Sequence, residues 1–232
     1  MDPVSYSPVL AALPARERDF LIDRAVKRRL QEDDILHLGG ETADRVHLVM
    51  SGTLKHTVCG AGPVDTIVGL SIQGDLVGDI GLVDRGAQPF DTFGASDCVL
   101  LGIETDLLRG AIMRHPVACL ALAGTFAERT RWMAAAANDR SSARVPARLA
   151  GRLLDLAEML GRMNGGAIEL DLPLAQTDLG RLAGISREST CKTLRRFRSA
   201  GVLDYKGRRV KILRPDVLRH IKCEGRAVRP SR

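Results

Sequence analysis

A short run of side chains near the C-terminus combines an arginine, a glutamate and further cations at helical spacing. In GISRESTCKTLRRFRSAGVL, residues 184–203, Arg187 and Glu188 directly follow Ser186, and Lys192 comes four residues after Glu188. Ser186 suits a helix N-cap, because its hydroxyl can accept a bond from a free amide of the first turn. Arginine can bond O6 and N7 of guanine together, and a carboxylate accepts from N4 of cytosine. We therefore predict that Arg187, Glu188 and Lys192 read base edges in DNA.

The glutamate distinguishes this prediction from a general attraction to polyanions. A carboxylate that faced phosphates would be repelled, so Glu188 among basic neighbours favours contact with bases. The alternative is an ordinary helical hairpin on whose surface Arg187, Glu188 and Lys192 form ion pairs with one another.

The segment around these residues predicts the elements that position them. Residues 174–183 form a first helix, Gly184 permits the turn after it, and the second helix buries Thr190, Leu194 and Phe197 along one stripe. VLDYKGRRVKIL then predicts a hairpin with a cationic tip, which completes a winged helix-turn-helix. For the phosphate backbone we predict contacts from Thr177, Ser186, Arg195, Lys206, Arg208 and Arg209.

The charge distribution agrees with a nucleic-acid partner. The net charge is +6, but residues 1–139 carry 13 Lys and Arg against 19 Asp and Glu, whereas residues 140–232 carry 21 against 9. The basic charge is therefore confined to the C-terminal part, as expected for a polyanion-binding unit, although solvated helix faces would give the same excess.

The N-terminal part shows a different pattern. Residues 16–30 predict a short amphipathic helix. Between residues 34 and 103, the short apolar runs ILHL, VHLVM, TIVGLSI and CVLLGI are separated by Gly, Asp and Pro turns. Such spacing predicts an antiparallel β-barrel or jelly roll.

A long helix is predicted after a break at His115-Pro116. Its apolar side chains recur at about 3.5 residues, which gives more apolar surface than its neighbourhood can bury. It either packs against the β unit or pairs with the same helix of a second chain, through Leu120, Phe126 and Met133. We predict a polar hinge at residues 138–149, NDRSSARVPARL, beyond which the chain is helical again.

Composition excludes several other classes of protein. Apolar residues make up 45% of the 232 residues, no run is long enough to span a membrane, and the N-terminus does not resemble a secretory signal. The five scattered cysteines show neither metal-ligand spacing nor a disulfide framework, so we expect a reducing, cytoplasmic location. We find no nucleophile with a base, no metal set and no phosphate loop. Accordingly we expect no enzyme, no catalytic residue and no metal.

The order of β-barrel, long helix and winged helix-turn-helix resembles the family of the cyclic AMP receptor protein and the fumarate and nitrate reduction regulator, over about residues 15–220. Residues 184–203 are similar to its DNA-reading signature, in which Ser-Arg-Glu-Thr/Ser is followed by a basic residue four positions after the Glu. LVMSGTLK and GDLVGDIGLVD match two barrel segments. The resemblance places Arg187, Glu188 and Lys192 at base-contacting positions, with Lys192 where Arg is more usual.

The resemblance implies an α+β chain with a cyclic-nucleotide-binding-like barrel at residues 1–115, a dimerisation helix and hinge at 116–145, and a DNA-binding domain at 146–232. It implies a homodimer that binds a palindrome with TGTGA-like half-sites, one DNA turn apart. The expected partners are double-stranded DNA and a second copy, with RNA polymerase as a further candidate.

The resemblance also places an effector pocket at Gly78, Asp79 and Ile80. Relatives that bind cyclic nucleotides have Gly-Glu-Leu there and an Arg-Ser/Thr about ten residues later, but this chain has Pro89-Phe90 at the second position. Without that arginine a buried phosphate loses a charge-assisted bond, so we expect no cyclic AMP binding in the usual mode and assign no cofactor. Haem on His56 is not favoured, and a redox role for the thiol of Cys191 is left open.

Two functions follow from these observations. The first is a dimeric, sequence-specific DNA-binding transcription regulator. The second is a cyclic-nucleotide-binding regulatory module that acts through protein contacts. The missing phosphate arginine argues against the second function, and the set of Arg187, Glu188 and Lys192 favours the first.

Overall fold

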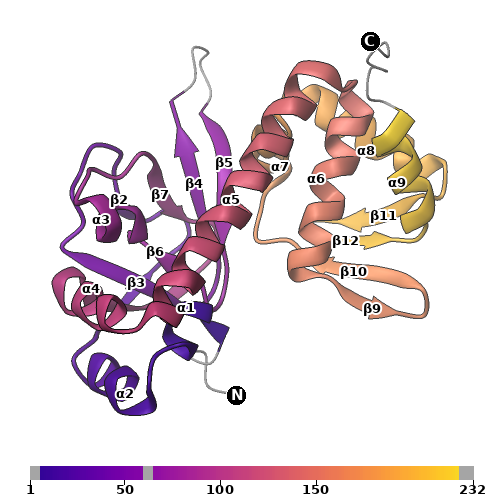
Figure 1. Cartoon of the computed structure of the whole chain (residues 1–232). Coiled ribbons are helices and arrows are strands. Elements are labelled where there is room, and N and C mark those ends of the chain that lie inside the picture. Colours follow the sequence, from indigo (N-terminus) through magenta and orange to yellow (C-terminus); the bar gives the residue numbers. More distant parts are fainter. Residues whose placement is uncertain (1–5, 60–64, 225–232) are drawn as a thin grey trace, which may run out of the picture. The chain divides into compact units, whose positions relative to one another are not determined.

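The computed structural model describes residues 6–59 and 65–224 (Figure 1). The chain divides into two units, residues 1–131 and 132–232, and the long helix α5 (Pro116–Ser142) contributes to both.

The first unit contains two four-stranded antiparallel sheets with the strand orders β1-β8-β3-β6 and β2-β7-β4-β5. The strands are β1 (Val26–Leu30), β2 (Ile35–His37), β3 (Arg45–Ser51), β4 (Leu54–Val58), β5 (Thr66–Ser71), β6 (Leu76–Val77), β7 (Asp91–Gly94) and β8 (Cys98–Glu104). Leu36 and Leu54 of one sheet share a buried cluster with Val49 and Leu100 of the other. The predicted barrel is thus an open jelly roll of two packed sheets.

Short helices cover one end of the jelly roll. They are α1 (Pro8–Ala11), α2 (Ala15–Asp23), α3 (Asp79–Asp84) and α4 (Thr105–Arg114). Leu10, Leu21 and Leu108 from these helices pack with Leu48 of β3 and Ala118 of α5 in a second buried cluster.

At the centre of the second unit is α6 (Val145–Leu160), which contacts three other helices and a strand of a small sheet. The other helices are α7 (Gln176–Ala183), α8 (Arg187–Ser199) and α9 (Pro215–Glu224), and the sheet runs β11-β12-β10-β9. Its strands are β9 (Arg162–Asn164), β10 (Ala167–Asp171), β11 (Leu203–Lys206) and β12 (Arg209–Ile212). Leu149, Leu153 and Leu156 of α6 are fully buried beneath this arrangement, which is a winged helix-turn-helix (Figure 1).

One prediction of local structure was wrong. Residues 16–30 are not one helix, because α2 ends at Asp23 and residues 26–30 form β1, which pairs with β8. Within the predicted hinge at 138–149, α5 continues to Ser142 and α6 begins at Val145, so only Ala143 and Arg144 lie between the two helices. Pro146 does not interrupt α6, since it lies in the first turn, where its missing N–H has no helical partner to lose.

The break at His115 is confirmed, and α4 and α5 meet there at 115°. Across the described ranges, none of the helices alone has both the length and the apolar composition to cross a membrane. Only the bent pair of α4 and α5, taken together, has that length and composition.

Candidate nucleic-acid interface

The turn between α7 and α8 depends on two glycines. Gly184 ends α7 in the left-handed region, with φ 63° and ψ 39°, where a side chain would be strained. At Gly180 an added Cβ would lie 2.7 Å from Oγ1 of Thr190 and 3.0 Å from the carbonyl oxygen of Ile185. The two helices therefore approach closely enough that only glycine fits at this point of α7.

Ser186 caps α8, as predicted. Its Oγ accepts a bond from the amide of Ser189 at 3.2 Å, and its carbonyl accepts from Oγ1 of Thr190 at 2.9 Å. Thr190, Leu194 and Phe197 are buried along one stripe, which fixes the face of α8 that points inward.

The opposite side of α8 carries the predicted base-reading residues. Arg187, Glu188 and Lys192 are all exposed, and Arg187 and Glu188 are the first two helical residues. Among the residues that the structure describes, none of the three has a salt-bridge partner. The alternative of an ion-paired surface is thus not what the structure contains, and their charged groups face solvent.

The predicted phosphate-binding residues lie around this face. Thr177 is exposed in the first turn of α7, and Arg195 is exposed one turn beyond Lys192. Arg198, which the sequence did not single out, instead turns to the wing: its Nε lies 2.7 Å from Oδ1 of Asp204, and its guanidinium lies over the ring of Tyr205.

The wing is the hairpin of β11 and β12, whose tip is Gly207-Arg208. Gly207 has φ 60°, which a two-residue hairpin turn with glycine first requires. Lys206 and Arg209 are exposed and pair across the turn, so the cations of this hairpin gather at its tip.

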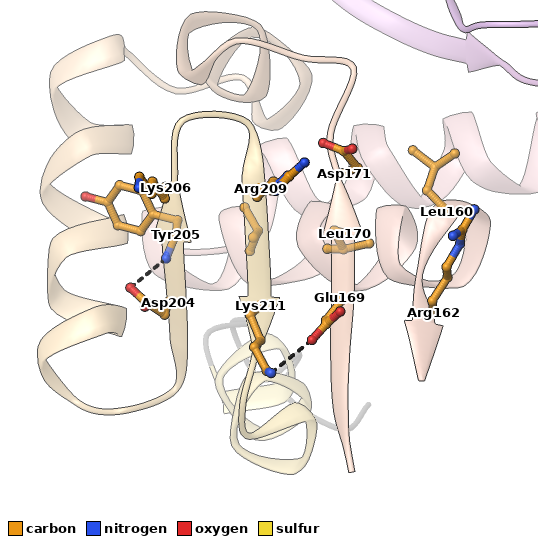
Figure 2. A pocket seen from close by; sticks show the side chains of 11 residues that line it. Leu160, Arg162, Glu169, Leu170, Asp171, Asp204, Tyr205, Lys206, Arg209 and Lys211 are labelled. Atoms are coloured by element: carbon orange, nitrogen blue, oxygen red, sulfur yellow. Dashed lines mark hydrogen bonds and ion pairs between the residues drawn. The ribbon is translucent and has the colours of Figure 1, made fainter. Parts of the chain in front are cut away.

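A hollow of about 630 Å³ lies on the wing sheet. Figure 2 shows the side chains that line it, with Lys206 and Arg209 near the tip of the hairpin. Further from the tip, Nζ of Lys211 lies 2.9 Å from Oε1 of Glu169 on the neighbouring strand. That contact, together with a bond from Asn164, lowers the pKa of Glu169. The middle of the sheet therefore has paired charges.

The predicted effector residues lie in the first unit, at the start of α3. Asp79 is 2% exposed, and Nη1 of Arg129 in α5 lies 2.8 Å from each of its carboxylate oxygens. Nη2 of Arg129 donates to the carbonyl of Leu76 at 2.7 Å. Burial raises the pKa of Asp79, although Arg129 acts in the opposite direction. Sequence reasoning missed Arg129, because no local pattern relates residues 50 positions apart.

The residues near this acid do not fit a cyclic nucleotide in the usual mode. At the position where the resemblance places the phosphate-binding Arg-Ser/Thr, this chain has Pro89-Phe90. Arg85 lies on the surface, where its Nη2 contacts Asp106 at 3.3 Å. Arg129 already holds Asp79. A cyclic phosphate would thus be buried without the charge-assisted bonds that compensate its desolvation.

His56 is an internal member of the jelly roll. Its Nδ1 lies 2.9 Å from Oγ1 of Thr92, and its Nε2 lies 2.8 Å from Oγ of Ser71. Burial lowers the pKa of His56 to about 3, with a further contribution from the charge of Arg129. Because both ring nitrogens are engaged, the ring is not presented to a haem iron.

Two family models match the chain. Residues 27–115 match the cyclic nucleotide-binding domain, and residues 147–221 match the Crp-like helix-turn-helix domain. These ranges cover the jelly roll and the winged helix-turn-helix.

Known proteins of similar sequence and fold are regulators. The chain is 30% identical over 176 residues to the CRP-like cAMP-activated global transcriptional regulator of Mycobacterium tuberculosis, covering 75% of this chain and 77% of that protein. It is 25% identical over 208 residues to Electron transport regulator A of Shewanella oneidensis, covering 84% and 77%. FixK2 from Bradyrhizobium japonicum has a similar structure, with a TM-score of 0.75 at 18% identity over 88% of this chain and 98% of that one. At that identity the likeness shows the fold alone.

Proposed function

Since this chain belongs to the Crp-Fnr family, we propose that it is a transcription regulator that binds an inverted repeat in DNA as a homodimer. The family consists of DNA-binding regulators rather than enzymes. Regulators of this kind act at promoters, and RNA polymerase is therefore a further proposed partner.

The observation that carries the proposal is the outer face of α8. Arg187, Glu188 and Lys192 project from a capped helix whose other side is buried, and their charges have no partner among the described residues. In the major groove, Arg187 would donate to guanine and Glu188 would accept from cytosine. Lys192 is a single-point donor where the family more often has the two-pronged Arg, so its base pair would be read less strictly.

The remaining polar groups would hold the sugar–phosphate backbone. Thr177 in the first turn of α7 offers a hydroxyl donor, and the tip of the wing offers positive charge. We assign the phosphate contacts to Thr177, Ser186, Arg195, Lys206, Arg208 and Arg209.

The dimer contact is proposed along α5. Val117 and Leu120 are 67% and 74% exposed, and with Gly124 and Ala127 they follow the alternating three- and four-residue spacing of a helix–helix seam. Met133 is also exposed. Phe126, which we predicted at the contact, packs instead against the core of its own unit and is left out of the proposed seam.

We further propose that DNA binding does not need cyclic AMP. The charge of Asp79 is compensated by Arg129 from within the chain, and the position of the phosphate-binding arginine is taken by Pro89-Phe90. Any effector of the jelly roll must therefore fit a site in which Asp79 is paired with Arg129 and residues 89–90 are Pro-Phe.

A gel-shift series tests the function directly. Purified protein without nucleotide is titrated into a TGTGA inverted repeat, a scrambled duplex and a single half-site, with and without cyclic AMP. We expect the repeat to be bound at least about a thousandfold more tightly than scrambled DNA. Cyclic AMP is expected to leave that ratio unchanged.

The proposal has three parts, namely sequence-specific binding, dimerisation and independence from cyclic AMP, and a different result would contradict each of them. Equal affinity for repeat and scrambled DNA, together with no protected inverted repeat on genomic fragments, would remove the sequence-specific function. If the wild type sediments as a monomer at micromolar concentration, the proposed dimer is contradicted. The variant Leu120→Glu should be such a monomer. A large gain in affinity on adding cyclic AMP would overturn the effector proposal.

A further inference from the structure

The last turns of α5 form part of the DNA-binding unit. Asp139 of α5 is only 4% exposed, although it is an acidic residue near the end of a helix. Trp132, two helical turns earlier on α5, lies against the guanidinium of Arg152 from α6, with the central carbon of the guanidinium 4.9 Å from the ring centre. The end of α5 and the middle of α6 therefore share a buried charged contact.

Arg152 is the centre of this contact. Its side chain is 3% exposed, and its Nη2 lies 3.3 Å from Oδ2 of Asp139 and 3.0 Å from Oδ2 of Asp155. Nζ of Lys222 in α9 lies 3.5 Å from Oδ1 of Asp155. Two acids, two cations and one aromatic ring thus connect α5, α6 and α9.

The backbone of α6 passes close to these charged side chains at Gly151. An added Cβ at Gly151, the residue before Arg152, would lie 3.5 Å from both Oδ2 of Asp139 and Cε of Lys222. The charged groups accordingly lie in a narrow junction of three helices, where a shift of one helix would pull the ion pairs apart.

Stability alone does not account for such a group of charges. Desolvation offsets most of the attraction in a buried ion pair, and apolar residues of similar size often stabilise a fold as well or better. What an ion pair adds is a definite geometry, because a guanidinium and a carboxylate form good hydrogen bonds only in a limited range of positions.

The same helix connects this junction to the recognition helix. Arg148, one turn before Arg152 on α6, donates through Nε to the carbonyl of Ala183 at 3.1 Å, and its Nη2 contacts the carbonyl of Gly184. Those carbonyls end α7 and begin the turn into α8. One turn of α6 therefore contacts the end of α5 through Arg152 and the turn before α8 through Arg148.

We propose that Arg152 is a positioning residue that fixes the direction of the recognition helix relative to the end of α5, and so the spacing between half-sites that the dimer accepts. This inference rests on the proposed function, in which α5 joins the two subunits. Arg152 is buried and touches no DNA. Its effect is expected in the geometry of the site, while the identity of the bases is still read by α8.

The test compares the full-length protein with Arg152→Met, Asp139→Asn and Arg152→Lys. Glu158→Gln is the matched control, because Glu158 is exposed on the same helix. Fluorescence anisotropy measures affinity for TGTGA inverted repeats whose spacer is the preferred length, or one or two base pairs shorter or longer. The same proteins are measured on a repeat with one base changed in one half-site, and thermal unfolding is followed separately.

We expect the wild type and Glu158→Gln to lose at least about tenfold in affinity for each wrong spacer. For Arg152→Met and Asp139→Asn that loss should shrink to about threefold or less, since the orientation is no longer fixed. The penalty for the changed base should stay as in the wild type. Arg152→Lys keeps the charge but not the planar guanidinium, and its loss of affinity for a wrong spacer should lie between those of the wild type and Arg152→Met.

An unchanged spacer profile in the folded variants, with only a lower unfolding temperature, would overturn the inference. If Arg152→Met does not fold, Asp139→Asn decides, because Arg152 then keeps its contact with Asp155. Failure of the wild type to prefer any inverted repeat would instead contradict the proposed function itself, so the two failures are distinguishable.

Discussion

Replacing Glu188 by alanine separates base reading from general affinity for DNA. Glu188 is the second residue of α8, exposed, and without an ion-pair partner in the described part of the chain. Its contribution to folding is therefore that of an acid in the first helical turn, about 0.3–1 kcal/mol. The variant should remain folded at room temperature.

The effect on recognition is expected to be larger and confined to one base pair. A well-placed side-chain contact to a base edge contributes about 1–3 kcal/mol of discrimination, which corresponds to about 5- to 150-fold in affinity. The loss of a negative charge between Arg187 and Lys192 does not weaken attraction to phosphates. Non-specific affinity should be unchanged or raised.

The assay measures dissociation constants for the preferred inverted repeat and for repeats in which one position of one half-site is changed to each other base. For Glu188→Ala, the preference at one position should fall by the factor given above, while the other positions keep theirs. Glu158→Gln, an exposed change on α6, should leave every ratio intact. Full discrimination at every position in Glu188→Ala would refute the assignment of Glu188 to a base.

Two further predictions concern the wing and the jelly roll. Arg208→Ala keeps the main-chain bond from the amide of Leu172 to the carbonyl of residue 208. The variant should bind all sequences more weakly and reduce the slope of log affinity against log salt concentration by about one. A slope equal to that of the exposed-surface control Arg219→Ala would contradict this prediction. The folded-state pKa of about 3 for His56 lies below the unfolded value, so the unfolded chain binds the extra proton and stability is lost as pH falls from about 6.5 towards 3. Between pH 7.5 and 4.5, the free energy of unfolding measured with urea should fall by about 2–3 kcal/mol less in His56→Gln than in the wild type. If it falls as much in His56→Gln as in the exposed control His220→Gln, the prediction is refuted.

The recognition helix was predictable because its determinants are local. The stripe of Thr190, Leu194 and Phe197 follows the helical period, and Ser186 and Gly184 mark the boundaries by their own backbone chemistry. The family resemblance and the open jelly roll were likewise visible in short sequence segments.

Strands whose residues do not alternate between apolar and polar could not be predicted in the same way. Residues 26–30, VKRRL, bury only Leu30 and form a strand because β8 offers them a partner. In β4, Leu54 and Lys55 are neighbours on opposite faces, yet both are buried, and Nζ of Lys55 reaches Asp33 at 2.6 Å. Tertiary pairing overrides the local pattern in both cases.

The charged contacts of α5 were missed for a different reason. Asp79 and Arg129, like Asp139 and Arg152, are ordinary members of charged surfaces when only the sequence is read. Their importance comes from burial, which depends on how helices far apart in the chain pack together.

The bond between Arg198 and Asp204 has a consequence for sequences outside the half-site. It attaches the first wing strand to the last turn of α8, so the protein itself sets the distance from the proposed base-reading side chains to the wing tip. DNA must then bring its neighbouring backbone to that distance through its own curvature and minor-groove width. Flanking base pairs that bend easily will favour the complex although no side chain touches them.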